Sequence, residues 1–555
     1  MRLRRLRALH KRRRELLGRG VCRVSTNSPT ESVEVFIRSS MPSSWAVASI
    51  AEIAALNPPL ARPIKDDDQP VGFVPMAAVA EQFGGIKTAE HRLYAKVKKG
   101  YTPFVPGDVI MAKITPCMEN GKGGVVRGDP QTVFFGSTEF HVLRPRTGIA
   151  PDWIGLFLSQ ESVRRVARLR MKGSAGQLRV PSGFFEQLAI PVAPSEEQRR
   201  ISDRVAELLS DLDAGIAALE RVKRNLVRYR AAVLHAAVTG QLTAAWRERN
   251  GPPSETGQQL LERILIERRR IWEERTLAKH QADGKQPPKG WKARYNGPFS
   301  LPKSHRTSVL PVVPANWCWA ALDQLLVSVQ NGTSVVPREP SGVPILRISA
   351  VRPMRVDLAD TRYLTEQEAV DANSWIAEND LLFTRYNGSA HLCGVCGRVR
   401  GLVGKVAYPD KLIRCRTVVS DVLPDFLELA LSAGFSRRSI ELCLRTTAGQ
   451  VGVSGADLKQ TPVPVPPCAE QQAIVELANE RLSQIESLSS EVERNMARAS
   501  RLRQSILKSA FEGHLVPQDP ADEPASVLIE RIRAASLPPA AKKPRKTNTR
   551  KTAKT

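Results

Sequence analysis

The chain has 555 residues, of which 42% are hydrophobic and 25% charged, so it can form three or four globular domains with real cores. Its net charge of +26 and pI near 10.1 favour nucleic acid as a partner. The eight scattered cysteines and the lack of a secretory signal argue against a disulfide framework and indicate a reducing cytoplasm. No apolar run approaches the ~18 residues of a membrane helix, so we expect no membrane contact.

The first 40 residues form a strongly basic extension. Residues 1–40 contain about eleven Lys or Arg and about three acids, and they show no apolar periodicity. Residues 542–554 contain about seven basic residues and no acid. We therefore predict a basic disordered extension at 1–40 and a basic disordered tail at 537–555. We also expect translation to start at Met41, or residues 1–40 to be disordered.

Two blocks, residues 41–194 and 314–467, are predicted to be mixed, strand-rich domains. They contain short apolar or alternating runs bounded by Gly, Pro and Asp, a pattern typical of strands. The predicted strands are Val109–Ile114, Thr132–Phe135, His141–Leu143, Leu381–Thr384 and Leu402–Ala407.

The strongest signal in the sequence is an internal repeat. Gly173–Thr243 matches Thr446–Val516 at a constant offset of 273, without a gap. The starts of the two halves are also alike, while most of the sequence between start and repeat diverges. The matching motifs are Pro42-x-x-Trp45 with Pro314-x-x-Trp317, Ala175-Gly176-Gln177 with Ala448-Gly449-Gln450, Pro194 with Pro467, and Glu197-Gln198 with Glu470-Gln471.

The matching blocks are predicted to be long helices, a first spacer helix within 195–245 and a second within 468–515. Apolar residues recur at steps of three and four, which is typical of a coiled-coil seam; a helix inside a larger core remains an alternative. Ser195-x-x-Gln198 predicts a capping box, and Gly240 and Gly513 predict the C-terminal ends. The predicted seam consists of Val205, Leu212, Leu219, Leu226, Leu482, Ile485, Val492 and Ile506, with Val222 and Tyr229 on the same stripe.

Residues 246–313 form a basic linker with one predicted helix, Gln258–Lys279. Residues 516–536 form a short helical tail, and Leu528–Ile532 within it is similar to Leu260–Ile264 in the linker. The fold class is therefore α+β: two mixed strand-rich domains separated by long helices, with a pseudo-twofold repeat. The helices must be antiparallel, because an order of domain, helix, domain, helix closes only if the second helix returns along the first.

The doubled order of these motifs resembles the specificity subunit of type I restriction-modification systems. The resemblance covers the chain from Met41 to about Ile532, although no single motif is specific. The poor cap at Cys468-Ala469-Glu470, the extension and the long basic linker depart from the family pattern.

The resemblance implies that each variable block is a target recognition domain that reads half of a split DNA sequence. It implies that the helices dock two adenine-methylating modification subunits, and that restriction subunits join them in defence against foreign DNA. Catalysis would belong to those partners, which use S-adenosylmethionine, ATP and magnesium, and this chain would be non-enzymatic with no cofactor of its own.

Base reading requires Arg, Lys, Asn or Gln side chains presented to the major groove. Side chains of these types follow strand-like runs in both domains, where a phosphate contact is the alternative role for each. The candidate DNA-binding residues are Lys113, Asn120, Lys122, Arg127, Arg347, Arg385, Asn387 and Lys405.

Signals of catalysis or metal binding are weak. Asn57-Pro58-Pro59-Leu60 resembles the base-holding loop of amino-methyltransferases, but Leu60 stands where an aromatic side chain would stack on the base. The spacing of Cys393 and Cys396 fits half of a zinc site or a redox pair, and only Cys415 and Cys443 could complete a zinc site. We therefore predict no catalytic residue and no metal site.

Two alternatives to a specificity subunit remain at this point. A self-contained DNA methyltransferase would bind S-adenosylmethionine as a purified chain. A basic coiled-coil scaffold would bind all duplexes with equal affinity at fixed salt.

Overall fold

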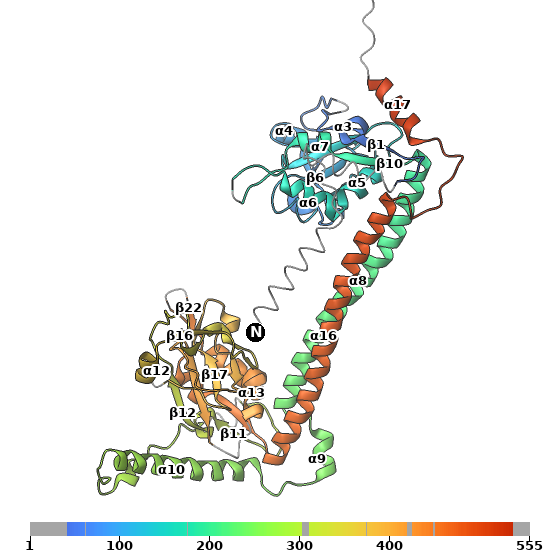
Figure 1. The fold of residues 1–555 in the computed structure, drawn as a ribbon. Helices are drawn as coiled ribbons and strands as arrows, with labels where there is room; N and C mark the ends of the chain where they lie inside the picture. Colours follow the sequence, from blue (N-terminus) through green and yellow to red (C-terminus); the bar gives the residue numbers. More distant parts are fainter. Residues whose placement is uncertain are drawn as a thin grey trace, which may run out of the picture. The chain divides into compact units, whose positions relative to one another are not determined.

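The computed structural model describes residues 41–60, 63–174, 176–301, 310–372, 374–418, 424–447 and 450–536. The predicted extension at 1–40 and tail at 537–555 lie outside these residues. The chain divides into two compact units (Figure 1). Among the described residues, unit 1 consists of 41–218 and 495–536, and unit 2 of 219–494. None of the helices in the described part of the chain is long and apolar enough to cross a membrane.

Unit 1 contains two four-stranded sheets, and the strand β6 is buried at every position because it lies inside the first sheet. The first sheet has the order β2 (Ala54–Leu56), β9 (Phe140–Pro145), β6 (Val109–Ala112) and β7 (Gly123–Val125). The second has the order β4 (Glu90–Leu93), β3 (Pro70–Val74), β8 (Phe134–Gly136) and β5 (Thr102–Phe104). A further pair joins β1 (Ala46–Ser49) to β10 (Ala189–Val192).

Short helices cover the sheets of unit 1 (Figure 1). They are α3 (Ile50–Ile53), η1 (Met76–Ala78), α4 (Tyr94–Val97), α5 (Pro151–Ser159), α6 (Glu161–Leu169) and α7 (Ser182–Gln187). Trp153 of α5 is fully buried in the largest core cluster of this unit, and its indole lies 4.4 Å from the ring of Phe511. The core of the sheet domain therefore continues into the end of the second long helix.

Unit 2 contains the same central sheet. Its order is β12 (Leu326–Asn331), β20 (Leu412–Thr417), β17 (Leu381–Thr384) and β19 (Cys396–Arg398). Smaller sheets pair β11 (Cys318–Ala321) with β23 (Pro462–Val465), β13 (Val343–Leu346) with β16 (Thr361–Leu364), and β14 (Val351–Arg352) with β15 (Arg355–Val356). A third group contains β18 (Tyr386–Asn387), β22 (Gln450–Gly452) and β21 (Arg445–Thr447).

The helices of unit 2 repeat those of unit 1 in part. They are η3 (Leu322–Leu325), η4 (Ile348–Ala350), α12 (Glu366–Ala372), η5 (Ala390–Leu392), α13 (Pro424–Ser432), α14 (Gly434–Leu442) and α15 (Gly455–Gln460), with α9 (Ala244–Asn250), α10 (Gly257–Ala282) and η2 (Trp291–Arg294) in the linker. The matching pairs are β6 with β17, α5 and α6 with α13 and α14, and α7 with α15. The repeat found in the sequence therefore extends through the diverged blocks as a repeat of topology.

The two long helices are α8 (Ser195–Val238) and α16 (Cys468–Phe511), each of 44 residues. They run side by side in opposite directions within each unit (Figure 1). An ion pair joins Asp213 to Arg503 in unit 1, and Lys223 lies 3.3 Å from Glu493 in unit 2. The predicted α+β fold with long antiparallel helices is thus confirmed.

The predicted seam lies on the inner faces of these helices. Val205, Leu226, Leu482, Ile485 and Val492 are buried, and Leu212, Leu219 and Ile506 are partly buried. The extension of the stripe to Val222 and Tyr229 is wrong, since both side chains are 43% exposed. Tyr229 lies at the edge of the contact between the helices, where its hydroxyl accepts a hydrogen bond from Arg481 of α16 at 3.1 Å.

A buried joint ties each long helix to the start of a sheet domain. In unit 1 the indole Nε1 of Trp45 donates to Glu197 Oε2 at 2.9 Å, and in unit 2 that of Trp317 donates to Glu470 Oε2 at 2.8 Å. These contacts explain why the Pro-x-x-Trp and Glu-Gln motifs recur together in the sequence.

The glycines that end the long helices are part of the same joints. Gly240 and Gly513 have left-handed φ angles of +76° and +71°. A side chain at Gly240 would collide with Pro314, and one at Gly513 with Pro42. Both predicted helix ends are confirmed, and each glycine is required by its conformation and by the adjacent proline.

The similarity between the linker and the tail also has a structural basis. Leu260, Leu261 and Ile264 of α10 are buried in unit 2, and Leu528, Ile529 and Ile532 of α17 (Ala525–Ser536) are buried in unit 1. Both helices pack against the start of a sheet domain, α10 on η3 and β11, and α17 on α3 and β1.

Two local predictions are wrong. Ser195 is not an N-cap: it is the first residue of α8, and its hydroxyl donates to the carbonyl of Gly148 at 2.9 Å. Residues Leu402–Ala407 do not form a strand. Gly401 and Gly404 have φ angles of +68° and +75°, which break the extended backbone, and Val403 between them is 91% exposed.

Candidate nucleic-acid interface

The equivalent strands β6 and β17 end at the same kind of junction. Each is followed by a basic residue, Lys113 or Arg385, and then by a segment that pairs with a hairpin. In unit 1, Ile114 and Lys172 both bridge to Arg179; in unit 2, Tyr386 and Arg445 both pair with Gly452. We call residues 172–179 and 445–452 the shared hairpins, because they contain the repeated Ala-Gly-Gln motif. The described residues of each hairpin therefore pair with the segment that leaves the central strand.

Backbone hydrogen bonds close both junctions in the same way. The N–H of Val180 donates to the carbonyl of Lys113 at 2.9 Å, and that of Val453 donates to the carbonyl of Arg385 at 2.9 Å. These bonds hold the hairpin against the residue that leaves the strand. The backbone frame of the junction is therefore common to both domains, while the side chains that it carries differ.

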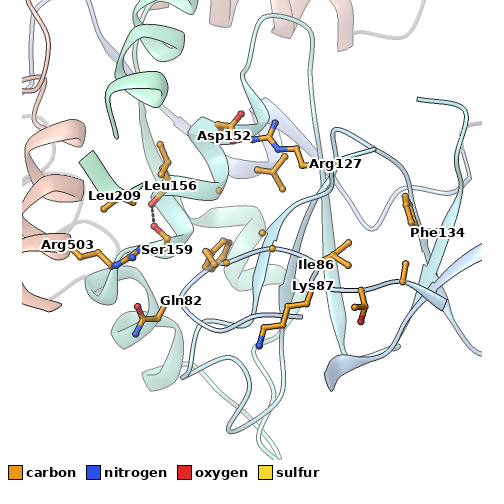
Figure 2. A pocket seen from close by; sticks show the side chains of 18 residues that line it. Gln82, Ile86, Lys87, Arg127, Phe134, Asp152, Leu156, Ser159, Leu209 and Arg503 are labelled. Atoms are coloured by element: carbon orange, nitrogen blue, oxygen red, sulfur yellow. Dashed lines mark hydrogen bonds and ion pairs between the residues drawn. The ribbon is translucent and has the colours of Figure 1, made fainter. Parts of the chain in front are cut away.

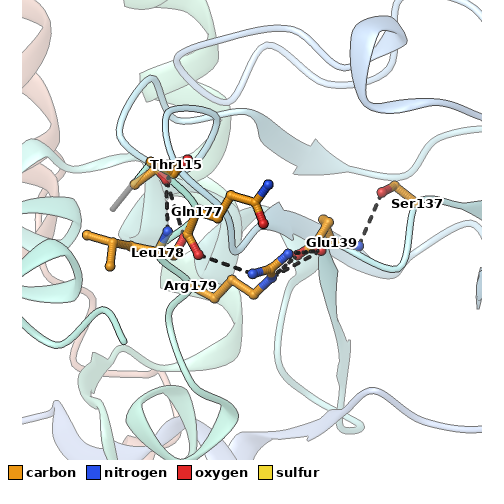
Figure 3. A network of polar contacts seen from close by, with 7 residues as sticks. Thr115, Ser137, Glu139, Gln177, Leu178 and Arg179 are labelled. Atoms are coloured by element: carbon orange, nitrogen blue, oxygen red, sulfur yellow. Dashed lines mark hydrogen bonds and ion pairs between the residues drawn. The ribbon is translucent and has the colours of Figure 1, made fainter. Parts of the chain in front are cut away.

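In unit 1 an ion pair clamps the hairpin to Glu139, the residue directly before β9 (Figure 3). The Arg179 guanidinium donates to both carboxylate oxygens of Glu139, from Nε to Oε2 at 2.9 Å and from Nη2 to Oε1 at 2.8 Å. Hydrogen bonds from Arg179 lower the pKa of Glu139, so this carboxylate is ionised at neutral pH. The N–H of Leu178 also donates to Thr115 Oγ1 at 3.1 Å. Because its charge is paired, Arg179 acts as a clamp for the hairpin.

Beneath this clamp lies a buried imidazole. His141 Nε2 is 2.9 Å from the carbonyl of Val180, and its Nδ1 is 3.4 Å from the amide of Asn57. Burial lowers the pKa of His141, so the neutral ring with its proton on Nε2 satisfies the Val180 carbonyl. This contact fixes the segment that leads out of the hairpin.

The junction in unit 2 lacks an equivalent clamp among the described residues. Arg385 lies over the ring of Tyr386 at 4.8 Å and reaches the carbonyl of Asp410 at 3.4 Å. Arg445 has an 80% exposed side chain, 3.6 Å from Asp457. An exposed pair at this distance contributes little, so Arg445 is available for an external contact.

Two other candidates predicted for unit 1 have side chains that bond to a different loop from the hairpin. Asn120 Nδ2 donates to Glu81 Oε1 at 2.9 Å, and Lys122 Nζ donates to the carbonyl of Met76 at 3.2 Å. Both bonds hold the loop at residues 76–85. The structure therefore gives these two side chains partners within the domain, although the carbonyl of Lys122 accepts the N–H of Ala112 at the end of β6.

Arg127 lines a cavity of about 450 Å³ in unit 1 (Figure 2). It forms an ion pair with Asp152, and the two lie together on one wall, while Leu209 and Arg503 approach from the long helices. The Arg127 side chain is 70% exposed, so this pair leaves its charge accessible.

The candidates predicted for unit 2 are dispersed as well. Arg347 lies 3.6 Å from Asp360, and Lys405 lies 5.6 Å over the ring of Trp375. Asn387 Oδ1 accepts the N–H of Ser389 at 3.0 Å, which orders the turn after Arg385. Only Arg385 and Asn387 of this set lie at the junction.

Other exposed cations stand beside the shared hairpins. Arg165, Arg170 and Lys172 in unit 1 are exposed and form no ion pair with other described residues, and Arg438 in unit 2 is similar. Sequence reasoning missed these residues. The signal was present, because the match at offset 273 extends back to Leu169 and Leu442 and includes Lys172 with Arg445.

The motifs that suggested chemistry have structural roles. Asn57 closes the turn after β2, where its side chain accepts the N–H of Val142 at 3.0 Å. Burial raises the pKa of the Cys393 and Cys396 thiols, which disfavours the thiolates that zinc requires. In the part of the chain that the structure describes, no group of three or more His, Cys, Asp or Glu side chains could hold a metal ion.

Comparison with known proteins gives this arrangement its family. Residues 42–227 match the model of the type I restriction modification DNA specificity domain. The type I restriction enzyme EcoKI specificity subunit of Escherichia coli strain K12 is 31% identical over 403 residues, which cover 71% of this chain and 73% of that protein. The chain belongs to the type I specificity subunits. The two strand-rich blocks are therefore DNA target recognition domains.

Other relatives agree with this result. The type I restriction enzyme EcoEI specificity subunit of Escherichia coli is 27% identical over 483 residues, covering 78% of this chain and 77% of the relative. A solved chain from a study of complex assembly in the type I R-M system has a TM-score of 0.55 at 16% identity, covering 85% of this chain and 99% of its own. That structural likeness concerns the fold alone.

Proposed function

We propose that each domain of this specificity subunit reads one half of a bipartite DNA target at the junction of the central strand and the shared hairpin. The observation that carries this proposal is a common backbone frame with different side chains. Lys113 follows the strand in one domain, where Arg385 follows it in the other, and Thr115 corresponds to Asn387. A common backbone that carries different side chains suits two domains that recognise different DNA sequences.

Among the predicted DNA-binding residues, Lys113, Arg385 and Asn387 are the best supported as base readers. Arg can bind guanine and Asn can bind adenine through two hydrogen bonds in the major groove. Arg127, Arg347 and Lys405 carry accessible charge and suit phosphate contacts. The side chains of Asn120 and Lys122 instead hold the loop at residues 76–85.

We further propose that the chain has no catalytic activity and works in the cytoplasm with partner subunits. Two modification subunits would dock on the repeated helices and supply methylation from S-adenosylmethionine. Restriction subunits would supply ATP- and magnesium-dependent cleavage. Two copies of one helical surface support two equivalent docking sites, and a methylation assay with the chain alone should show no turnover.

A domain exchange tests the reading function. Residues 42–194 would be replaced by the corresponding domain of a relative, and the methylated motif would be mapped across the genome of cells that also carry the modification subunit. We expect one half-site to change and the other to stay, because each junction is built within its own domain. Exchange of 314–467 is the matched control and should change the opposite half-site. A change of both half-sites by either exchange would contradict the proposal.

The spacing between half-sites gives a second test. Seven residues added to a helix lengthen it by ~10.5 Å, about three base pairs of duplex. Because α8 and α16 contact each other in both units, the heptad must enter both, after Ala218 and before Asn495. We expect a spacer longer by about one to three base pairs, reduced affinity and unchanged half-sites. An unchanged spacer in an active complex would show that the helices do not set this distance.

A further inference from the structure

Two leucines occupy the same exposed position in the two recognition domains. Leu169 is the last residue of α6 and is 81% exposed; Leu442 is the last residue of α14 and is 80% exposed. They are related by the offset of 273 and stand three residues before the shared hairpins. A single exposed leucine is ordinary, but the same exposure at equivalent places in two diverged domains calls for a common cause.

Folding does not supply that cause. The inner face of α6 buries Val163 and Ala167, and that of α14 buries Ser436 and Ile440. Leu169 and Leu442 point away from these faces, so each contributes little apolar burial to its domain. Packing among the described residues therefore does not explain either leucine.

The surroundings of Leu169 favour a polyanion. Residues 164–172 contain five cations and no acid, and three of these cations (Arg165, Arg170 and Lys172) are exposed without an ion pair to other described residues. A protein-docking surface is instead expected to have an apolar centre with few charges. A single leucine among arginines matches the side chains that enter a DNA groove while neighbouring cations hold the phosphates.

The second domain repeats this setting with less charge. Residues 437–445 contain Arg437, Arg438 and Arg445 and one acid, Glu441. Arg437 is engaged inside the domain, where its Nη2 donates to the carbonyl of Cys393 at 3.1 Å. Arg438 and Arg445 remain exposed on either side of Leu442 in the sequence. Both leucines thus stand between accessible cations.

We propose that Leu169 and Leu442 each enter a groove of duplex DNA, one at each half-site, and contact deoxyribose and base edges while the flanking cations bind phosphates. The inference rests on the proposed function, because it assigns one half-site to each domain. It adds a contact that the two domains share, and which therefore anchors each domain without selecting its sequence.

The test uses the complex of the full chain with its modification subunits and a duplex carrying the methylated motif. Leu169→Ala and Leu442→Ala would each weaken binding about tenfold, as expected for the loss of a partly buried leucine contact. The double variant would lose about a hundredfold, since distant sites are additive. Val312→Ala is the matched control, because Val312 is 95% exposed in an uncharged segment and should leave affinity unchanged.

Salt dependence identifies the contact. An apolar contact releases no counterion, so the slope of log affinity against log salt should be the same for Leu169→Ala and wild type. Arg170→Gln should reduce the slope by about 0.9. If the wild-type complex discriminates its target and both leucine variants keep full affinity, this inference is overturned but the proposed function is not. Failure of the variants to assemble with modification subunits would also overturn it, by showing a protein contact. A wild-type complex without discrimination would overturn the proposed function as well.

Discussion

The joints of the two units use the same tryptophan and glutamate but stabilise the carboxylate differently. In unit 2, Glu470 receives the indole of Trp317, the Thr243 hydroxyl at 2.7 Å and the guanidinium of Arg247. In unit 1, Glu197 receives the indole of Trp45 and the Gln518 amide. Burial raises the pKa of Glu197. Equivalent glutamates in a repeat can therefore keep the same hydrogen bond to tryptophan while the groups that stabilise the carboxylate differ.

Replacing the glutamate of each joint by alanine should give the largest difference in stability between the two units. Glu470→Ala leaves the Arg247 guanidinium without its carboxylate in a site where Glu470 is 1% exposed. We expect local stability in unit 2 to fall by about 3 kcal/mol. Glu197→Ala leaves neutral donors without an acceptor and should cost about 2 kcal/mol in unit 1. Hydrogen exchange of peptides from 314–321 and 42–49 would measure each, and equal losses would show that the Arg247 charge does not matter.

Replacing the carboxylates by amides should give a smaller but sharper difference. Glu197→Gln keeps an acceptor for the Trp45 indole and removes a charge that burial disfavours, so we expect a loss below about 1 kcal/mol. Glu470→Gln removes the counter-charge of Arg247 and should cost about 2 kcal/mol. The same exchange measurement applies. A milder effect at 470 than at 197 would reverse the interpretation of the two joints.

The repeated parts of this fold could be predicted well, because a motif that occurs twice at a constant offset can be recognised in a single sequence. In the sequence, Trp45 and Trp317 are each followed by a Glu-Gln pair about one domain length later. In the structure, each tryptophan contacts the glutamate of its pair. The ends of the long helices were predictable from Gly240 and Gly513, since few residues other than glycine adopt their left-handed backbone.

Features set by tertiary contacts were less predictable. Val222 continues the apolar periodicity of α8 but is 43% exposed, because the position of a seam on a helix drifts along its length and depends on the partner helix. The run Leu402–Ala407 is apolar enough for a strand, yet Gly404 within it and Gly401 before it have left-handed backbones that prevent one. Ser195 has the spacing of a cap but bonds to Gly148, a residue distant in the sequence.

The candidate interface was predicted only in part, for the same reason. The position of Lys113, Arg385 and Asn387 at the junctions was predictable because they follow recognisable strands. The roles of Asn120 and Lys122 depend on Glu81 and Met76, which lie on a loop that no local pattern connects to them. Leu169 and Leu442 were missed because exposure is a tertiary property.

The smallest predicted difference between the units concerns pH. Pairing of β9 with β6 and of β20 with β17 places Ile413, which cannot titrate, where unit 1 has His141. The charged groups near His141 are Lys113, which lowers its pKa, and Glu139, which raises it, but burial dominates and the pKa is lowered from 6.5. Below pH 6.5 the unfolded chain therefore binds more protons at His141 than the folded chain does. The contribution of His141 to the stability of unit 1 is complete above pH 6.5 and decreases as the pH falls below it. Unit 2 should lack this contribution.

Hydrogen exchange of peptides covering β9 and β20 between pH 7 and 5, corrected for intrinsic rates, would measure this difference. The expected result is a modest acid-induced loss of protection in β9 beyond any loss in β20. The matched variant is His141→Gln, whose amide can donate to the Val180 carbonyl without titrating. It should cost some stability at pH 7 but make the pH dependence of β9 resemble that of β20. If β9 keeps its acid sensitivity in this variant, the proton is taken up elsewhere in unit 1, and the buried imidazole is not what distinguishes the two sheets.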